Sequence, residues 1–196
     1  HGYFWTADAT ELSIYDRAAP LQTLFHWALA AFGWPFIHAA AVGTERGGVL
    51  LIGNSGAGQS TTALSCLAQV GIKYLSDHKC LVRFTPTPQV SALYTSAKIK
   101  ADMRERRPHF RPLLAGWDEA AKGGKGLVFL HPTCADHMIT SVPVKALLLP
   151  AVTHRTEASI RPVARSAVIW CGTAARVPIG RISETRHSST CRAPRS

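Results

Sequence analysis

The chain has 196 residues, which suits a single domain, and its hydrophobic content of 46% is enough for a packed core. Its formal net charge of +10 fits a partner rich in phosphate, although a basic surface by itself mainly affects solubility and non-specific binding. The five cysteines form no C-x-x-C pair, which argues against a zinc site and against a disulfide framework. We therefore expect a cytoplasmic protein with no membrane span, since no apolar run approaches the necessary length.

Apolar spacing and turn residues predict an alternation of short strands and helices. In chain order, the first half is expected to hold strands at residues 3–6 and 11–15, a helix at 21–32, strands at 36–42 and 49–52, and a helix from about 60 to 70. The second half is expected to hold strands at 72–75, 80–84 and 90–94, a short basic helix at 97–106, a loop over 108–126, and strands at 127–130, 144–149 and 158–163. Pro20 suits the first turn of one helix, and Gly33 and Gly71 suit helix ends. The Glu-Arg-Gly-Gly turn at residues 45–48 joins its neighbouring strands into a β-hairpin.

The most informative stretch lies between the strand at 49–52 and the helix that follows it. It matches the phosphate-binding pattern G-x-x-x-x-G-K-[ST] at every position but one, in the strand–loop–helix context that the pattern requires. Three glycines let the backbone curl so that successive N–H groups can face an anion, and the positive end of the helix adds to the attraction. The candidate nucleotide-binding residues are Gly53, Asn54, Ser55, Gly56, Ala57, Gly58, Gln59, Ser60 and Thr61. The alternative is a glycine-rich strand-to-helix turn that binds nothing.

The one departure from the pattern is Gln59, which occupies the lysine position. Its neutral amide can donate hydrogen bonds to a phosphate oxygen, but it cannot offset the charge on a transferring phosphoryl group. The loop therefore indicates nucleotide binding more strongly than it indicates catalysis. Ser60 stands where the pattern places a hydroxyl ligand for Mg²⁺.

Asp77 follows a predicted strand, at the kind of strand end where the ligand clefts of α/β sheets form. Its carboxylate could accept the proton of an attacking serine hydroxyl or bind Mg²⁺. The alternative is a turn aspartate that hydrogen-bonds to its own backbone. Lys98 and Lys100 lie on the predicted basic helix, and a solvated helix face explains them better than a charge that reaches a phosphate and partly replaces the missing lysine.

Several of these motifs together resemble the bacterial HPr serine kinase/phosphatase family. The resemblance rests on His38, on G-N-S-G-A-G-Q-S-T-T-A-L at residues 53–64 and on Y-L-S-D-H at residues 74–78. It is closer to the smaller single-domain relatives, which include kinases encoded beside lasso-peptide and other peptide-tailoring genes. Further stretches that resemble those relatives are residues 91–98, 130–132 and 145–150. The resemblance covers roughly residues 20–165.

This resemblance implies an α/β fold of the P-loop type shared with phosphoenolpyruvate carboxykinase, with a mixed sheet and flanking helices. It also implies that ATP and Mg²⁺ are used to phosphorylate a serine hydroxyl. Residues 53–61 would hold the triphosphate, Ser60 and Asp77 would lie at the metal, and Asp77 would be the general base. His38 matches a histidine that lies close to the phosphates, so it is a second candidate catalytic residue. The family's second aspartate is His78 here, and many family members form oligomers.

Three functions remain open from the sequence. The first is an ATP-dependent serine kinase that acts on a peptide or small protein. The second is a degenerate nucleotide-binding module that has lost phosphotransfer, since both Gln59 and His78 remove expected charge. The third, nucleic-acid binding driven by the net charge, ranks last because no aromatic-interleaved basic motif is present. We expect neither a specific nucleic acid nor a membrane as a partner. A homo-oligomer would be compatible with the resemblance to the family.

The chain is expected to divide into a kinase-like domain at residues 1–168 and a basic, disordered tail at residues 169–196. The tail carries several arginines, a single acidic residue and no apolar period. The first residue is His1 rather than Met, which fits a fragment or a processed chain with a truncated N-terminus.

Overall fold

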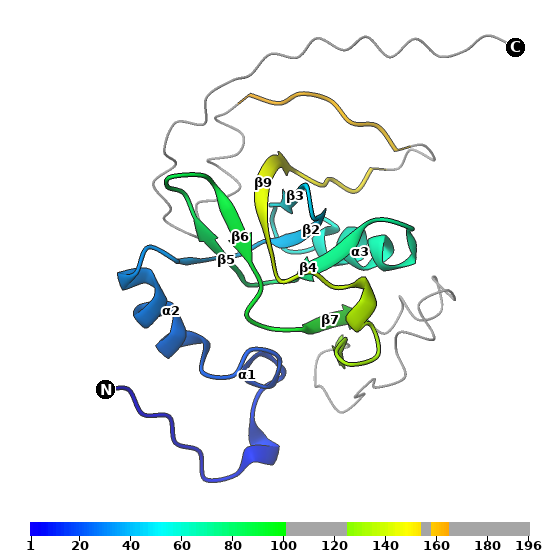
Figure 1. Ribbon diagram of the computed structural model, residues 1–196. Coiled ribbons are helices and arrows are strands. Elements are labelled where there is room, and N and C mark those ends of the chain that lie inside the picture. Colours follow the sequence, from blue (N-terminus) through cyan, green and yellow to red (C-terminus); the bar gives the residue numbers. More distant parts are fainter. Residues whose placement is uncertain (101–124, 154–157, 165–196) are drawn as a thin grey trace, which may run out of the picture.

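The computed structural model describes residues 1–100, 125–153 and 158–164, which form a mixed α/β fold (Figure 1). Its helical segments are η1 (Ala9–Glu11), α1 (Ile14–Ala18), α2 (Gln22–Ala31), α3 (Gln59–Ser65), η2 (Cys66–Ala68) and η5 (Ala135–His137). Its strands are β1 (Phe36–Ile37), β2 (Ala40–Thr44), β3 (Gly47–Leu51), β4 (Lys73–Ser76), β5 (Cys80–Arg83), β6 (Gln89–Ser91), β7 (Ser96–Lys100), β8 (Lys125–Phe129) and β9 (Ser141–Leu148). The α/β class expected from the sequence is confirmed.

The larger sheet of the described chain has seven strands in the order β1-β5-β6-β9-β3-β2-β4, and β7 pairs with β8 in a separate two-stranded sheet. Neighbouring strands are antiparallel except for β3 and β9, which are parallel. Because β3 and β4 both run antiparallel to β2, they point the same way as each other and as β9. The carboxyl ends of β3, β4 and β9 therefore lie at one edge of the sheet.

The hairpin expected from the Glu-Arg-Gly-Gly turn is confirmed. β2 pairs with β3 in a regular register from Ala40 opposite Leu51 to Thr44 opposite Gly47. A Cβ atom at Gly43 would lie 2.8 Å from the Cα of Gly48, so the two strands approach as closely as they do because glycine occupies this position. The second strand of the hairpin, β3, leads directly into the glycine-rich loop.

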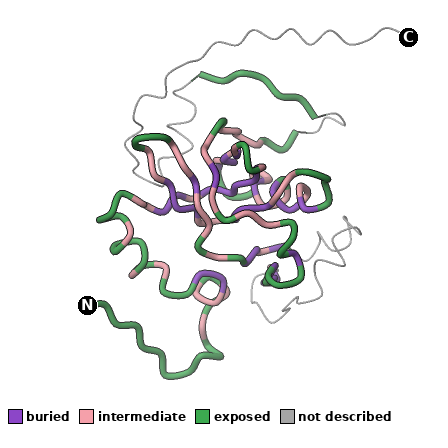
Figure 2. The backbone as a smooth tube through the Cα atoms, viewed as in Figure 1, coloured by how far each residue is buried: buried purple, intermediate pink, exposed green. Residues whose placement is uncertain are grey.

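The core lies on both faces of this hairpin, because successive strand residues point to opposite sides. On one side, Ala40, Val42 and Leu51 pack with side chains of α3, η2 and the β7–β8 sheet. On the other side, Ala41 and Leu50 pack with residues of β4, β5, β6 and β9. Figure 2 shows the buried positions concentrated in the sheet and in α3, whereas the N-terminal segment and α2 are mostly exposed.

The N-terminal part differs from its prediction. Residues 3–6 form no strand, and residues 11–15 enter η1 and α1 instead. Helix α1 begins there because the Ser13 hydroxyl accepts a hydrogen bond from the backbone N–H of Asp16, a standard helix N-cap. The predicted helix at 21–32 is confirmed as α2, which ends at Ala31, and Gly33 follows its C-cap with a φ of 80°. However, no residue of α2 is buried.

Three later predictions also need correction. The single strand expected at 36–42 is two strands, β1 and β2, which are interrupted at His38 and lie at different places in the sheet. The basic helix expected at 97–106 begins as strand β7. No strand forms at 158–163.

The remaining strand predictions, from 72–75 to 144–149, are confirmed with small shifts of their ends as β4, β5, β6, β8 and β9. The helix after the loop is confirmed as α3 followed by η2. Residues 101–106, most of the expected loop over 108–126 and the whole of the expected tail lie outside the described residues. Within the described chain, no helix is long and apolar enough to cross a membrane.

Candidate functional site

The glycine-rich loop joins β3 to α3 through two glycines in the left-handed region. Gly56 has a φ of 88° and Gly58 a φ of 98°, conformations that L-residues with side chains rarely adopt. The backbone N–H of Ala57 donates to the carbonyl of Asn54 at 3.0 Å and closes the turn. Asn54, Ser55 and Gly56 are exposed, so the outer part of the loop is open to a ligand.

Gln59, the residue in the lysine position, is turned toward the strand rather than outward. Its amide Nε2 donates to the carbonyl oxygen of Leu51 at 3.0 Å, and only 8% of the residue is exposed. The amide thus satisfies the last carbonyl of β3 at the point where the strand ends. The sequence had marked Gln59 as a neutral donor to phosphate, and this internal hydrogen bond was not foreseen.

Ser60 and Asp77 meet at the first turn of α3. The Ser60 hydroxyl donates to Oδ1 of Asp77 at 2.9 Å. This contact spans the sheet edge described above, because Ser60 follows β3 and Asp77 follows β4, and the two strands point the same way. The two residues that the sequence proposed as metal ligands are therefore in direct contact.

The carboxyl group of Asp77 is buried and incompletely hydrogen-bonded. Its Oδ2 atom has no hydrogen-bond partner within the part of the chain that the structure describes. Burial raises the pKa of Asp77, although the Ser60 hydrogen bond and the charge of Lys98 act in the opposite direction. An uncompensated buried carboxylate costs stability unless a cation or a proton donor completes it.

Hard oxygen ligands of this kind fit Mg²⁺. The Ser60 hydroxyl and the Asp77 carboxylate supply them at one point, and Mg²⁺ is usually bound by one or two protein groups together with substrate phosphates. Among the described residues, no group of three or more histidine, cysteine or acidic side chains gathers as a metal site. Ser60 and Asp77 are thus the two residues at this point that could hold such an ion.

The turn after Asp77 is tight and strained. The backbone N–H of Lys79 donates to the carbonyl of Asp77 at 2.9 Å, and the residue between them, His78, has a φ of 71°. This is a three-residue γ-turn with a left-handed central residue, which is rare for a non-glycine side chain. The hydroxyl of Ser76 donates to the Lys79 carbonyl at 2.8 Å and holds the turn closed. Such strain is found most often at functional sites.

His38 lies against this turn rather than against the loop. Its Nδ1–H donates to the backbone carbonyl of His78 at 3.1 Å, and the two rings meet edge to face with centroids 4.7 Å apart. Burial lowers the pKa of His38 and lowers that of His78 to about 3, so both rings are neutral at pH 7. In this structure His38 supports the turn that positions Asp77.

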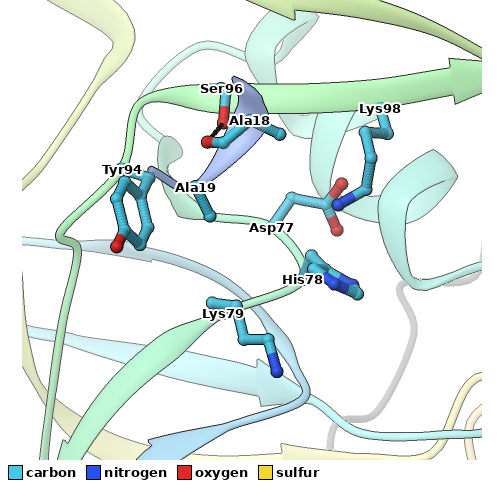
Figure 3. Close-up of a pocket in the computed structure, with 8 residues that line it drawn as sticks. All are labelled: Ala18, Ala19, Asp77, His78, Lys79, Tyr94, Ser96 and Lys98. Carbon is cyan, nitrogen blue, oxygen red and sulfur yellow. Dashed lines mark hydrogen bonds between the residues drawn. The ribbon is translucent and has the colours of Figure 1, made fainter. Parts of the chain in front are cut away.

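A pocket opens beside Asp77 (Figure 3). It is lined by Ala18, Ala19, Asp77, His78, Lys79, Tyr94, Ser96 and Lys98. The N-terminal segment forms one wall, because the Ser96 hydroxyl donates to the Ala18 carbonyl and the Tyr94 hydroxyl donates to the Pro20 carbonyl. Figure 3 shows the Lys98 side chain extending toward Asp77, whereas Lys79 extends away from it.

The structure therefore brings together some of the residues selected from the sequence and not others. Ser60 and Asp77 are in contact, and the loop residues 53–61 lie at the same edge of the sheet. His38 and Gln59 are turned to backbone carbonyls instead. Lys98, for which the sequence allows either a charge near the phosphates or a solvated basic face, lines the pocket. The pocket wall at Ala18 and Ala19 was missed, because its sequence carries no recognisable motif.

No family model matches the chain, and no curated protein matches it.

Proposed function

We propose that this chain binds a nucleoside triphosphate, ATP, on the loop at residues 53–61 and transfers its terminal phosphoryl group to a serine hydroxyl of a peptide or small protein. The fold that goes with this proposal is the P-loop fold of the HPr kinase and phosphoenolpyruvate carboxykinase type, for which the strand–loop–helix unit β3–loop–α3 is the support. The proposal places the reaction in the cytoplasm.

The observation that carries the proposal is the hydrogen bond between Ser60 and Asp77. The carboxylate of Asp77 is buried, and in addition to a backbone interaction with His78 it accepts a hydrogen bond from the hydroxyl of the glycine-rich loop. Its second oxygen lacks a partner among the described residues. A buried carboxylate in this state at the end of a phosphate-binding loop fits a group that acts on a bound ligand.

Each group of the proposed site has a role that follows from its chemistry. The loop amides would surround the phosphates, and the Ser60 hydroxyl and Asp77 carboxylate would hold Mg²⁺, which offsets phosphate charge when bound. Burial raises the pKa of Asp77 and so makes its carboxylate a stronger base toward a serine hydroxyl. His38 holds the backbone carbonyl of His78 and with it the position of Asp77.

The experiment combines binding with turnover. The chain is incubated with Mg²⁺, γ-labelled ATP and a serine peptide encoded near its gene, and its melting temperature is measured with and without ATP. We expect labelled peptide and an ATP-dependent rise in the melting temperature, both absent with adenosine. Asp77→Asn should remove the label and reduce the ATP-dependent rise to the part that does not depend on Mg²⁺. A melting temperature that does not change on addition of millimolar ATP would refute the proposal.

A second candidate function is favoured by one observation. Because the Gln59 amide is engaged by the Leu51 carbonyl, the loop lacks a phosphate-facing side chain at this position. The chain would then be a nucleotide-binding module without phosphotransfer. It predicts the same ATP-dependent stabilisation with no label on any peptide, and label restored by Gln59→Lys would support this alternative.

A further inference from the structure

The glycine-rich loop has a deficit of positive charge. No lysine or arginine occurs between Gly47 and Ile72, a stretch that includes the whole loop and the helix behind it. Gln59 replaces the usual lysine and donates to Leu51 instead of facing outward. A triphosphate carries several negative charges, and loop amides alone offset them only in part. Apart from the charge of a bound Mg²⁺, any positive charge beside the triphosphate would therefore have to come from elsewhere in the fold.

Lys98 is placed to supply such a cation. It lies on β7, where Ala97 and Ile99 point into the core, so Lys98 points to the opposite side and lines the pocket beside Asp77. Its charge acts on the carboxylate of Asp77, which in turn accepts the Ser60 hydrogen bond. Figure 3 shows its side chain directed toward Asp77. Lys98 is thus linked to the loop through Asp77, which interacts with Lys98 and with Ser60.

The surroundings of Lys98 hold the side chain in the pocket rather than in solvent. Its Nζ lies 4.9 Å from the centroid of the Tyr15 ring, a cation–π contact with helix α1. The same helix is fixed to β7 through the hydrogen bond from Ser96 to the Ala18 carbonyl. Burial lowers the pKa of Lys98 to about 8, with Asp77 acting in the opposite direction, so the amine is still charged at pH 7. A half-buried ammonium is a strong attractor for an anion.

We propose that Lys98 binds the terminal phosphates of the nucleotide and replaces the lysine that is missing at Gln59. This inference rests on the proposed function, because it assigns a residue to the same triphosphate site. The phosphate-binding charge would then come from the β7 strand rather than from the first turn of the helix. Lys100 lies two residues further along the same strand and is exposed, which makes it a matched control.

The test measures the affinities of ATP and AMP for the full chain, because a residue that contacts the terminal phosphates affects only the first. Lys98→Gln should weaken ATP binding by about tenfold to a hundredfold, as expected for a lost charge-assisted hydrogen bond, and leave AMP binding unchanged. Lys98→Arg should retain most of the ATP preference, and Lys100→Gln should behave as wild type. Adding Gln59→Lys to Lys98→Gln should recover ATP affinity.

The same titrations are repeated with EDTA in place of Mg²⁺, in order to separate contact from an indirect effect through Asp77. A loss of ATP affinity that persists in EDTA supports direct phosphate contact, whereas a loss that disappears in EDTA overturns it. Equal losses for ATP and AMP, or no loss in Lys98→Gln, also overturn the inference while leaving the proposed function standing. If the wild-type chain binds no ATP, the proposed function fails and this inference fails with it.

Discussion

Replacing Gln59 by lysine should lower the stability of the free chain and raise its affinity for ATP. In the free chain, the substitution removes the hydrogen bond from the Gln59 amide to the Leu51 carbonyl, at a position that is 8% exposed. Leaving a buried acceptor without its donor costs about 1–3 kcal/mol. For a chain of this size, each kcal/mol lowers the melting temperature by about 2–4 °C. We therefore expect Gln59→Lys to melt lower than wild type in the absence of ligand.

In the nucleotide complex, the new ammonium can face the phosphates. A hydrogen bond that involves a charged group contributes about 1.5–3 kcal/mol, which corresponds to roughly tenfold to a hundredfold in ATP affinity. The variant should accordingly bind ATP more tightly than wild type although its unliganded form is less stable. Its ATP-dependent rise in melting temperature should exceed that of the wild-type chain.

Two control variants separate these effects. Gln59→Met keeps the length of the side chain and removes the amide, so it should lose the same stability without gaining ATP affinity. Gln69→Lys adds the same charge at an exposed position after η2 and should change neither quantity. Stability is measured by thermal melts monitored by circular dichroism, and ATP affinity by calorimetric titration.

Two results would refute this reasoning. An unchanged or raised melting temperature in Gln59→Lys would mean that the amide does not support the end of β3. A lowered melting temperature without any gain in ATP affinity would mean that the loop does not present this side chain to a triphosphate, and the phosphate site would have to be abandoned.

Three further substitutions test the site. Because the pKa of Asp77 is raised in the folded chain, its ionisation lowers stability as the pH rises above 3.8. Asp77→Asn should therefore raise the melting temperature at pH 7, and the gain should shrink as the pH falls toward 3.8, in melts at several pH values. Gly58→Ala should cost about 1–2 kcal/mol of stability and weaken ATP binding, whereas Gly71→Ala, with a φ of 82°, should cost a similar amount and leave ATP binding unchanged. Ser60→Ala should remove the Mg²⁺-dependent part of ATP affinity in calorimetric titrations, and Ser65→Ala, whose hydroxyl donates to a backbone carbonyl of the same helix, should keep it. Equal effects on ATP affinity of Gly58→Ala and Gly71→Ala, or of Ser60→Ala and Ser65→Ala, would count against the site.

The elements that could be predicted from the sequence are those whose signals are local. The hairpin of β2 and β3 follows from a glycine turn between apolar strands, and α2 is bounded by Pro20 and Gly33. Helix α1 also had a local signal that was overlooked, the Ser13 cap with Asp16 three residues later.

The β7 strand was misread because its sequence is short and basic, although Ala97 and Ile99 alternate with Lys98 in the period of a strand. This alternation covers too few residues to distinguish the segment from a solvated helix. Its strand conformation comes from pairing with β8, which is distant in the sequence. Tertiary pairing of this kind decides short segments more often than intrinsic preference does.

For the site, residue identities could be chosen in advance but their contacts could not. The loop pattern and the strand end selected Ser60 and Asp77, and the structure places these two residues in contact, because strand ends at one sheet edge converge. The inward turn of Gln59 and the position of His38 against the His78 carbonyl depend on the packed structure. So does the place of Lys98 in a pocket that the N-terminal segment completes.

The most direct test of the central claim, that the loop after β3 binds a triphosphate, is amide hydrogen exchange measured by mass spectrometry with and without Mg²⁺ and ATP. Peptides that cover residues 53–61 and 74–80 should become protected with Mg²⁺ and ATP and should remain unchanged with adenosine. Exchange that is unaltered in both peptides at saturating ATP, or protection that falls only elsewhere in the chain, would contradict the account.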